Sequence, residues 1–185
     1  MLIKSLVLFL LLFSSIAHSQ ELHCTPELKK VVERIEQLPE GKELIDRVLE
    51  EGDLHIVINQ IYSKKFEGYW DASIRTIHVT KTPSDSAFIS TILFELHNAL
   101  RESDFEKTDQ MAYQGSLDRN GYVKAMEHIE YENARATSNL LNKGIELGLF
   151  PYDSYWEVSD TFEEHFLVQK QAGHAAWFAK MYDQL

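Results

Sequence analysis

The fold is decided by the stretch TILFELHNAL, which runs from Thr91 to Leu100. At about 100° per residue, most of its apolar side chains gather on one broad arc, as expected for a helix that packs on a core. Phe94 falls on the opposite side of this helix. The placement predicts that a second element covers that side, so the helix either forms the floor of a cleft or is buried nearly all round.

The same stretch carries a carboxylate, an imidazole and an amide, on Glu95, His97 and Asn98. In the motif His-Glu-x-x-His, the two histidines share one helical face and bind zinc, while the glutamate polarises a metal-bound water. Aligned on Glu95, this chain places Phe94 and Asn98 at the two histidine positions. His97 cannot replace them, because residues two apart on a helix do not share a face. Only the glutamate of the motif is present.

The first residues, Met1 to Ser19, have the features of a cleaved secretory signal peptide. Lys4 precedes an apolar run from Leu6 to Phe13, and residues 17–19 have the small-x-small pattern of a signal peptidase site. The apolar run is too short for an anchor that spans a bilayer. We therefore expect an exported protein, periplasmic or secreted, with no stable membrane insertion after cleavage.

The chain is acidic, with 18 Lys and Arg against 29 Asp and Glu among its 185 residues. Cleavage after Ser19 would remove only Lys4 from this balance, leaving 17 basic against 29 acidic residues, a net charge of −12. This charge argues against nucleic acid and anionic membranes as partners. Cys24 is the only cysteine, so it is expected to be a free thiol. Length and composition indicate one domain over residues 20–185.

Apolar periodicity predicts an α+β domain with a small antiparallel sheet of about three strands. Strands are expected at 54–59, 65–70 and 74–79, where β-branched and aromatic residues gather. Helical spacing indicates helices at 25–39, 40–51, 84–102, 122–142 and 160–182. The fourth should end at Gly144 and the last should begin with a capping box at Asp160 and Glu163. The connection between Ser103 and Asn120 is either a functional loop or holds a short helix.

A second acidic residue, Glu130, lies on the inward face of the helix expected at 122–142. A carboxylate there needs a partner or has a raised pKa, so Glu130 either pairs with a Lys or Arg or belongs to a metal or polar site. Glu127 lies further round the helix and is expected to be solvated. Four histidines outside the central helix lack metal-ligand spacing and are expected to be structural, namely His55, His78, His165 and His174. Several aromatic residues near the C-terminus fit either a groove or core packing, namely Tyr152, Tyr155, Trp156, Trp177 and Phe178.

A small sheet, a helix bearing Glu95 and a later helix with an inward Glu130 together resemble the core of the zincin metallopeptidases whose third ligand is a glutamate. The resemblance covers roughly Leu54 to Leu141. It implies a zincin-like fold in which Glu95 is similar to the general base and Glu130 to the third zinc ligand. Phe94 and Asn98 depart from the family motif, and this departure implies that zinc binding and peptidase activity are lost.

We therefore expect a degenerate metallopeptidase, or pseudoenzyme, that binds a protein or peptide ligand and carries no cofactor. Its cleft residues would be Phe94, Glu95, His97 and Asn98. The alternative is an atypical metal-dependent hydrolase that uses Glu95 and Glu130, with zinc as a possible metal. A third hypothesis is a small exported α+β protein whose match to the motif is accidental.

Overall fold

The computed structural model describes residues 20–59, 67–82 and 84–185, so the signal peptide expected at 1–19 lies outside the described residues. Within these residues the chain forms seven α-helices, two short 3-10 helices and four strands. In chain order they are β1 (Leu22–Cys24), η1 (Pro26–Leu28), α1 (Lys29–Gln37), α2 (Pro39–Leu49), β2 (Leu54–Asn59), β3 (Gly68–Asp71), η2 (Ala72–Ile74), β4 (Thr76–Thr80), α3 (Asp85–Leu100), α4 (Glu102–Tyr113), α5 (Arg119–Glu146), α6 (Phe162–Ala172) and α7 (His174–Tyr182).

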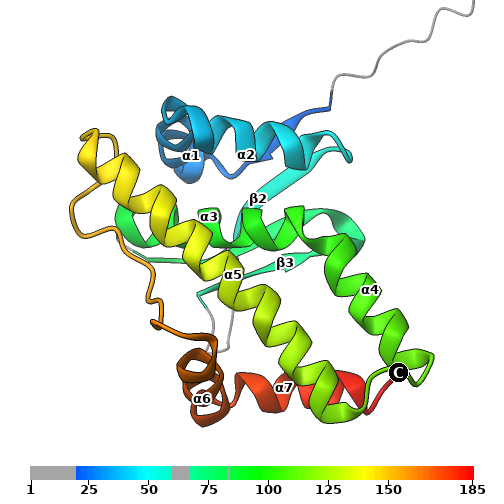
Figure 1. The fold of residues 1–185 in the computed structure, drawn as a ribbon. Coiled ribbons are helices and arrows are strands. Elements are labelled where there is room, and N and C mark those ends of the chain that lie inside the picture. Colours follow the sequence, from blue (N-terminus) through cyan, green and yellow to red (C-terminus); the bar gives the residue numbers. More distant parts are fainter. Residues whose placement is uncertain (1–19, 60–66, 83) are drawn as a thin grey trace, which may run out of the picture.

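The described strands form one mixed sheet in the order β1-β2-β4-β3 (Figure 1). β1, β2 and β4 run parallel, whereas β3 pairs antiparallel with β4 at the edge. The α+β class is confirmed, but the expectation of three antiparallel strands was wrong. β3 and β4 form an antiparallel hairpin with β3 at the edge of the sheet. β4 therefore lies between β3 and β2, and it runs parallel to β2. β1 was missed because three residues are too few to show a period.

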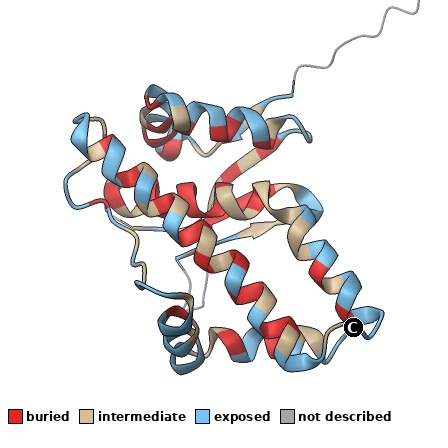
Figure 2. Ribbon diagram, viewed as in Figure 1, coloured by how far each residue is buried: buried red, intermediate tan, exposed pale blue. Residues whose placement is uncertain are grey.

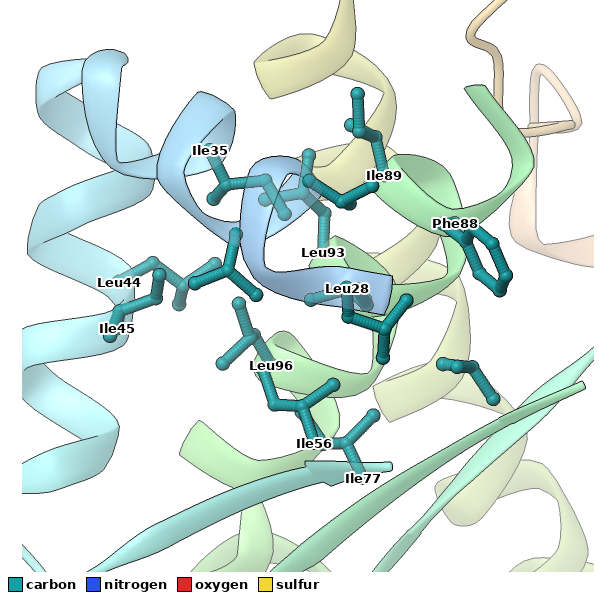
Figure 3. Packing of buried hydrophobic residues seen from close by; sticks show 14 of the residues in the cluster. Leu28, Ile35, Leu44, Ile45, Ile56, Ile77, Phe88, Ile89, Leu93 and Leu96 are labelled. Carbon is teal, nitrogen blue, oxygen red and sulfur yellow. The ribbon is translucent and has the colours of Figure 1, made fainter. Parts of the chain in front are cut away.

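α3 runs through the middle of the domain and is buried on nearly every side (Figure 2). One side packs with α1, α2 and the sheet, in a core where Leu93 and Leu96 cluster with Ile56 and Ile77 (Figure 3). Burying each such side chain contributes about 2 kcal/mol. α5 crosses the other side of α3 (Figure 1). The helix therefore has partners all round, and Phe94, opposite the core arc, is only 8% exposed.

Capping residues set the beginnings of the helices that carry the site. The hydroxyl of Ser84 accepts a hydrogen bond from the N–H of Ala87 at the start of α3. Asp118 accepts a 2.7 Å hydrogen bond from the N–H of Gly121 at the start of α5. The expected capping box is present but lies one residue later, because Thr161 and Glu164 form it.

Other details of the helices differ from the expectation. The connection between residues 103 and 120 holds α4, so it is not a structureless loop. The single helix expected at 160–182 is divided into α6 and α7 by Gly173, which has a φ of 87°. Gly144 does not end α5, because it lies inside the helix where a side chain would overlap the ring of Phe150. The left-handed glycine that follows α5 is Gly148, with a φ of 70°.

Candidate ligand-binding cleft

Two neighbouring cavities lie where β3, α3, α5 and α7 meet. Their volumes are about 260 Å³ and about 500 Å³. Residues from all four elements line both cavities, and these shared residues are Gly68, Phe94, Glu95, Glu130 and His174. We call the two cavities the central cleft. The two acidic residues singled out in the sequence therefore line one cleft, although they lie on different helices.

Glu95 is held at the cleft by a relay of side-chain amides. Its carboxyl group accepts a 3.0 Å hydrogen bond from Nδ2 of Asn98 and another from the backbone N–H of Trp70. Oδ1 of Asn98 in turn accepts a 2.8 Å hydrogen bond from Nδ2 of Asn133. The relay thus ties α5, α3 and β3 together. Glu95 is only 4% exposed, and burial raises its pKa to about 7, although the two hydrogen bonds act to lower it.

Glu130 lines the same cleft from α5 but has no such donors. It is partly buried, and among the described residues no side chain gives it a hydrogen bond or an ion pair. The Lys or Arg partner considered from the sequence is therefore not found in this part of the chain. Burial raises the pKa of Glu130 to about 8, with His174 acting to lower it and Glu95 acting to raise it. Near neutral pH the two carboxyl groups thus retain protons that ordinary carboxyl groups have lost.

The other two predicted cleft residues have different neighbours. Phe94 stacks on Trp156, with ring centroids 4.2 Å apart and an interplanar angle of 16°. Nδ1 of His97 lies 2.7 Å from the backbone oxygen of Leu93 and 3.1 Å from Oγ1 of Thr137, and burial lowers the pKa of His97. His97 is not among the described residues that line the cleft. The structure therefore separates it from Glu95, as the helical spacing predicts.

A buried carboxylate beside the cleft was missed by the sequence analysis. Glu127 is 0% exposed, so the expectation that it is solvated was wrong. Its Oε1 lies 3.1 Å from Nδ1 of His174, and its Oε2 lies 3.5 Å from Nε2 of His165. Burial acts to raise the pKa of Glu127, but the two histidines outweigh it and lower the pKa. This cluster joins α5 to α6 and α7, and it connects to the cleft through His174.

The edge of β3 that has no partner strand among the described residues borders the cleft. The backbone oxygen of Glu67 accepts a 2.7 Å hydrogen bond from the N–H of Thr80. In the antiparallel β3–β4 pair, residues whose backbone groups point towards β4 alternate with residues whose backbone groups point away from it. Gly68 and Trp70 therefore direct their backbone groups away from β4, and Glu95 binds the N–H of Trp70. Gly68 lies so close to α3 that a Cβ atom there would be 2.5 Å from Cγ2 of Thr91. The edge strand thus rests directly on the helix that carries Glu95.

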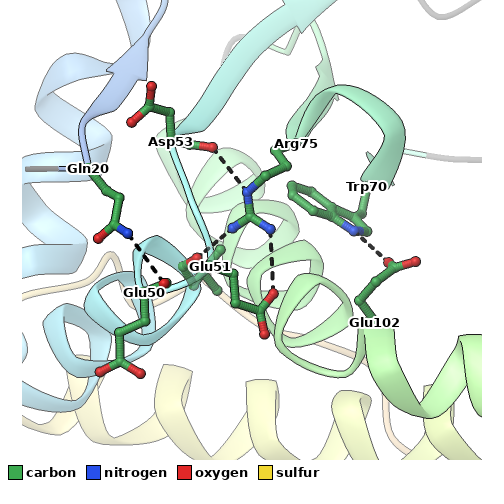
Figure 4. A network of polar contacts seen from close by, with 8 residues as sticks. Gln20, Glu50, Glu51, Asp53, Trp70, Arg75 and Glu102 are labelled. Atoms are coloured by element: carbon green, nitrogen blue, oxygen red, sulfur yellow. Dashed lines mark hydrogen bonds and ion pairs between the residues drawn. The ribbon is translucent and has the colours of Figure 1, made fainter. Parts of the chain in front are cut away.

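The side chain of Trp70 is held by a polar network at the end of β3 (Figure 4). Its indole N–H donates a 2.7 Å hydrogen bond to Glu102, and the guanidinium of Arg75 lies 5.6 Å from its ring centroid. Arg75 also donates to the backbone oxygens of Val48, at 2.5 Å, and Asp53, at 3.2 Å. These contacts make the β3 wall of the cleft well supported.

No family model matches the sequence, and no curated protein or solved structure shows significant similarity to it. Among the described residues, no three or more His, Cys, Asp or Glu side chains are placed to hold a metal ion together. None of the helices in the described part of the chain is long and apolar enough to cross a membrane. The chemistry of the central cleft is therefore the basis for a functional proposal.

Proposed function

We propose that this protein is an exported, zincin-like protein that has lost zinc and peptidase activity and acts by binding a protein or peptide ligand in its central cleft. The observation that carries this proposal is what occupies the two histidine positions of the zincin motif. Phe94 has no donor atom and stacks on Trp156. The amide of Asn98 is engaged on both sides, by Glu95 and by Asn133. This set of groups does not fit zinc, which takes imidazole, thiolate and carboxylate ligands.

The arrangement of the elements supports the zincin-like part of the proposal. An antiparallel edge strand, the helix bearing Glu95 and the later helix bearing Glu130 all border one cleft. Glu95 also has a role that needs no metal, because it receives hydrogen bonds from Asn98 and from the edge strand. A cleft with this arrangement of elements but without the two histidines of the motif is suited to binding a ligand rather than to cleaving it.

Metal analysis of the purified protein tests the proposal. After incubation with zinc and exhaustive dialysis, we expect the wild-type chain to retain none. The double variant Phe94→His/Asn98→His should retain one zinc ion per chain, because it restores two imidazoles one helical turn apart near Glu130. Adding Glu130→Gln to that variant should abolish its zinc binding. One tightly bound zinc ion per wild-type chain would refute the proposal.

An atypical metal-dependent hydrolase is the second candidate, and the carboxyl pair is the observation that favours it. With a pKa of about 7 for Glu95 and about 8 for Glu130, one carboxyl group could act as an acid while the other acts as a base. The test is a panel of peptide and ester substrates with added divalent metals. Activity that Glu95→Gln removes and that Glu43→Gln, on the exposed face of α2, leaves unchanged would support this candidate. If the panel reveals no such activity, the hydrolase is excluded for those substrates.

A further inference from the structure

A third cavity extends the central cleft towards the N-terminus of α3. It has a volume of about 530 Å³ and is lined there by Ser84, Ser86 and Ser90. It shares four lining residues with the smaller cavity of the central cleft, and these are Glu67, Trp156, Glu157 and Gln169. The three cavities therefore adjoin one another along α3, and together we call them the α3 groove. Its lining follows α3 from Ser84 to Asn98, roughly 21 Å at 1.5 Å per residue, which suits an extended ligand.

The α3 groove is lined mainly by acidic side chains, of which Glu95 and Glu130 retain protons near neutral pH. Carboxyl groups occur in every part of it, and these belong to Glu67, Asp153, Glu157, Glu95, Glu130, Glu102 and Asp109. No Lys or Arg is found among its described lining residues, where His165 and His174 are the only basic side chains. A cleft in which charges of one sign predominate, and whose walls have a low dielectric constant, attracts ligands of the opposite charge. The α3 groove is thus complementary to a cation.

The cavity of about 500 Å³, next to α7, adds an apolar character to this charge. Aromatic rings and thioethers make up much of its wall, and these are Tyr69, Trp70, Phe94, Phe105, Met126, Trp177, Phe178 and Met181. Such walls accept an apolar or aromatic side chain, and the ring faces also attract ammonium and guanidinium groups. A ligand that fits this cavity therefore combines apolar surface with positive charge.

The edge of β3 adds backbone recognition. Gly68 presents both its N–H and its C=O groups at this edge, and Trp70 presents its C=O group. An extended peptide can pair with such groups as an added strand. A simple polyamine has no amide groups to satisfy them and no side chain for the apolar cavity. The edge strand thus favours a peptide over other cations.

We propose that the ligand of the α3 groove is a basic peptide segment, bound in extended form along β3, with Lys or Arg side chains among the carboxyl groups and an apolar or aromatic side chain in the cavity next to α7. The inference rests on the proposed function, because it names the partner class of the same cleft. The occupant is a segment of another protein or a free peptide, and charge complementarity selects it.

Fluorescence anisotropy with matched peptides tests the inference. The probe is a dye-labelled octapeptide, Gly-Lys-Ala-Lys-Phe-Lys-Ala-Gly, and the controls replace every Lys with Gln, every Lys with Glu, or the Phe with Ser. We expect saturable binding of the Lys and Phe probe that weakens as salt rises. The Gln and Glu controls should bind much more weakly, and the Ser control should lose affinity. Equal binding of the Gln or Glu control would overturn the inference.

Two variants with the same charge change locate the binding. Glu157→Lys reverses an exposed carboxylate in the groove, whereas Glu43→Lys reverses one on α2, away from the groove. We expect Glu157→Lys to weaken the affinity for the probe about fivefold and Glu43→Lys to leave that affinity nearly unchanged, because the Coulomb energy falls with distance and screening. Glu130→Gln should also weaken the affinity for the probe. Equal losses in the two Lys variants would show that only net charge is sensed, which contradicts a groove site.

Spermine and product analysis separate the remaining outcomes. If spermine displaces the probe and binds as tightly as the probe does, the site recognises positive charge alone, and the peptide inference is overturned. Mass spectrometry of the probe after overnight incubation reports whether it is cleaved. Binding with cleavage would refute the non-catalytic function while the ligand class stands. An intact probe that fails to bind would refute the ligand class while leaving the loss of peptidase activity unaffected.

Discussion

Replacing Glu130 with Gln should stabilise the protein at neutral pH and above, because the change removes an acid whose ionisation the folded state disfavours. The carboxyl group of Glu130 has a pKa of about 8 in the folded protein against an ordinary value of 4.5. The folded state therefore binds this proton more tightly than the unfolded state, so stability falls as pH rises from 4.5 towards 8. At about 1.4 kcal/mol for each pH unit above 4.5, the loss at pH 7 is about 3 kcal/mol. A Gln side chain does not ionise and avoids this loss.

Urea unfolding at pH 5, 6, 7 and 8 measures the effect of Glu130→Gln. The stabilities of wild type and variant should nearly coincide at pH 5 and then diverge, with the variant more stable by a few kcal/mol at pH 7 to 8. Glu146→Gln makes the same chemical change at an exposed position of α5 and should follow the wild-type curve. Parallel pH curves for wild type and Glu130→Gln would refute the assignment of a raised pKa to Glu130.

Three further substitutions probe the walls of the cleft. Gly68→Ala would bring a Cβ atom to 2.5 Å from Cγ2 of Thr91, so we expect a loss of about 1 to 3 kcal/mol in thermal unfolding, and an unchanged melting temperature would contradict the close packing. Glu127→Gln should cost about 2 kcal/mol, most strongly between pH 4.5 and 6.5. There the lowered pKa of Glu127 and the raised pKa of His174 keep both groups charged in the folded state, and NMR titration should show a lower pKa for His174 in the variant. Glu95→Gln should loosen β3, seen as faster amide exchange there, because an amide offers one acceptor oxygen where the carboxylate offers two.

The parts of the site that lie on single helices could be predicted from the sequence. Helical spacing alone places Glu95 and Glu130 on inward edges of their helices and separates Glu95 from His97. It also shows that Phe94 needs a cover, which Trp156 provides. These inferences succeed because the sidedness of a helix is a local property that its sequence pattern specifies directly.

The features that depend on the meeting of distant elements could not be predicted in this way. Glu127 is buried where His165 and His174 contact it from two other helices, and no local sequence pattern predicts these contacts. Its position outside the apolar arc is typical of a solvated residue. The available signal in the sequence was Gly173, because a glycine within a long helical pattern can separate two helices, and here it starts α7 at His174. The parallel pairing of β1 likewise depends on a partner strand far along the chain.

Glu95 and Glu130 are the same residue type in the same cleft, yet their partners give them different roles. Glu95 receives two hydrogen bonds, so its position is set and its charge is partly compensated. Glu130 has no hydrogen-bond donor among the described residues, and only the more distant His174 partly compensates its ionisation. An arriving ammonium or guanidinium group therefore gains most at Glu130, because it supplies the missing counter-charge and lowers the raised pKa. Binding of a basic peptide near pH 7 should then release a proton from Glu130, and calorimetry in buffers of different ionisation enthalpy would detect that proton. Binding without proton release would contradict contact between the proposed ligand and Glu130.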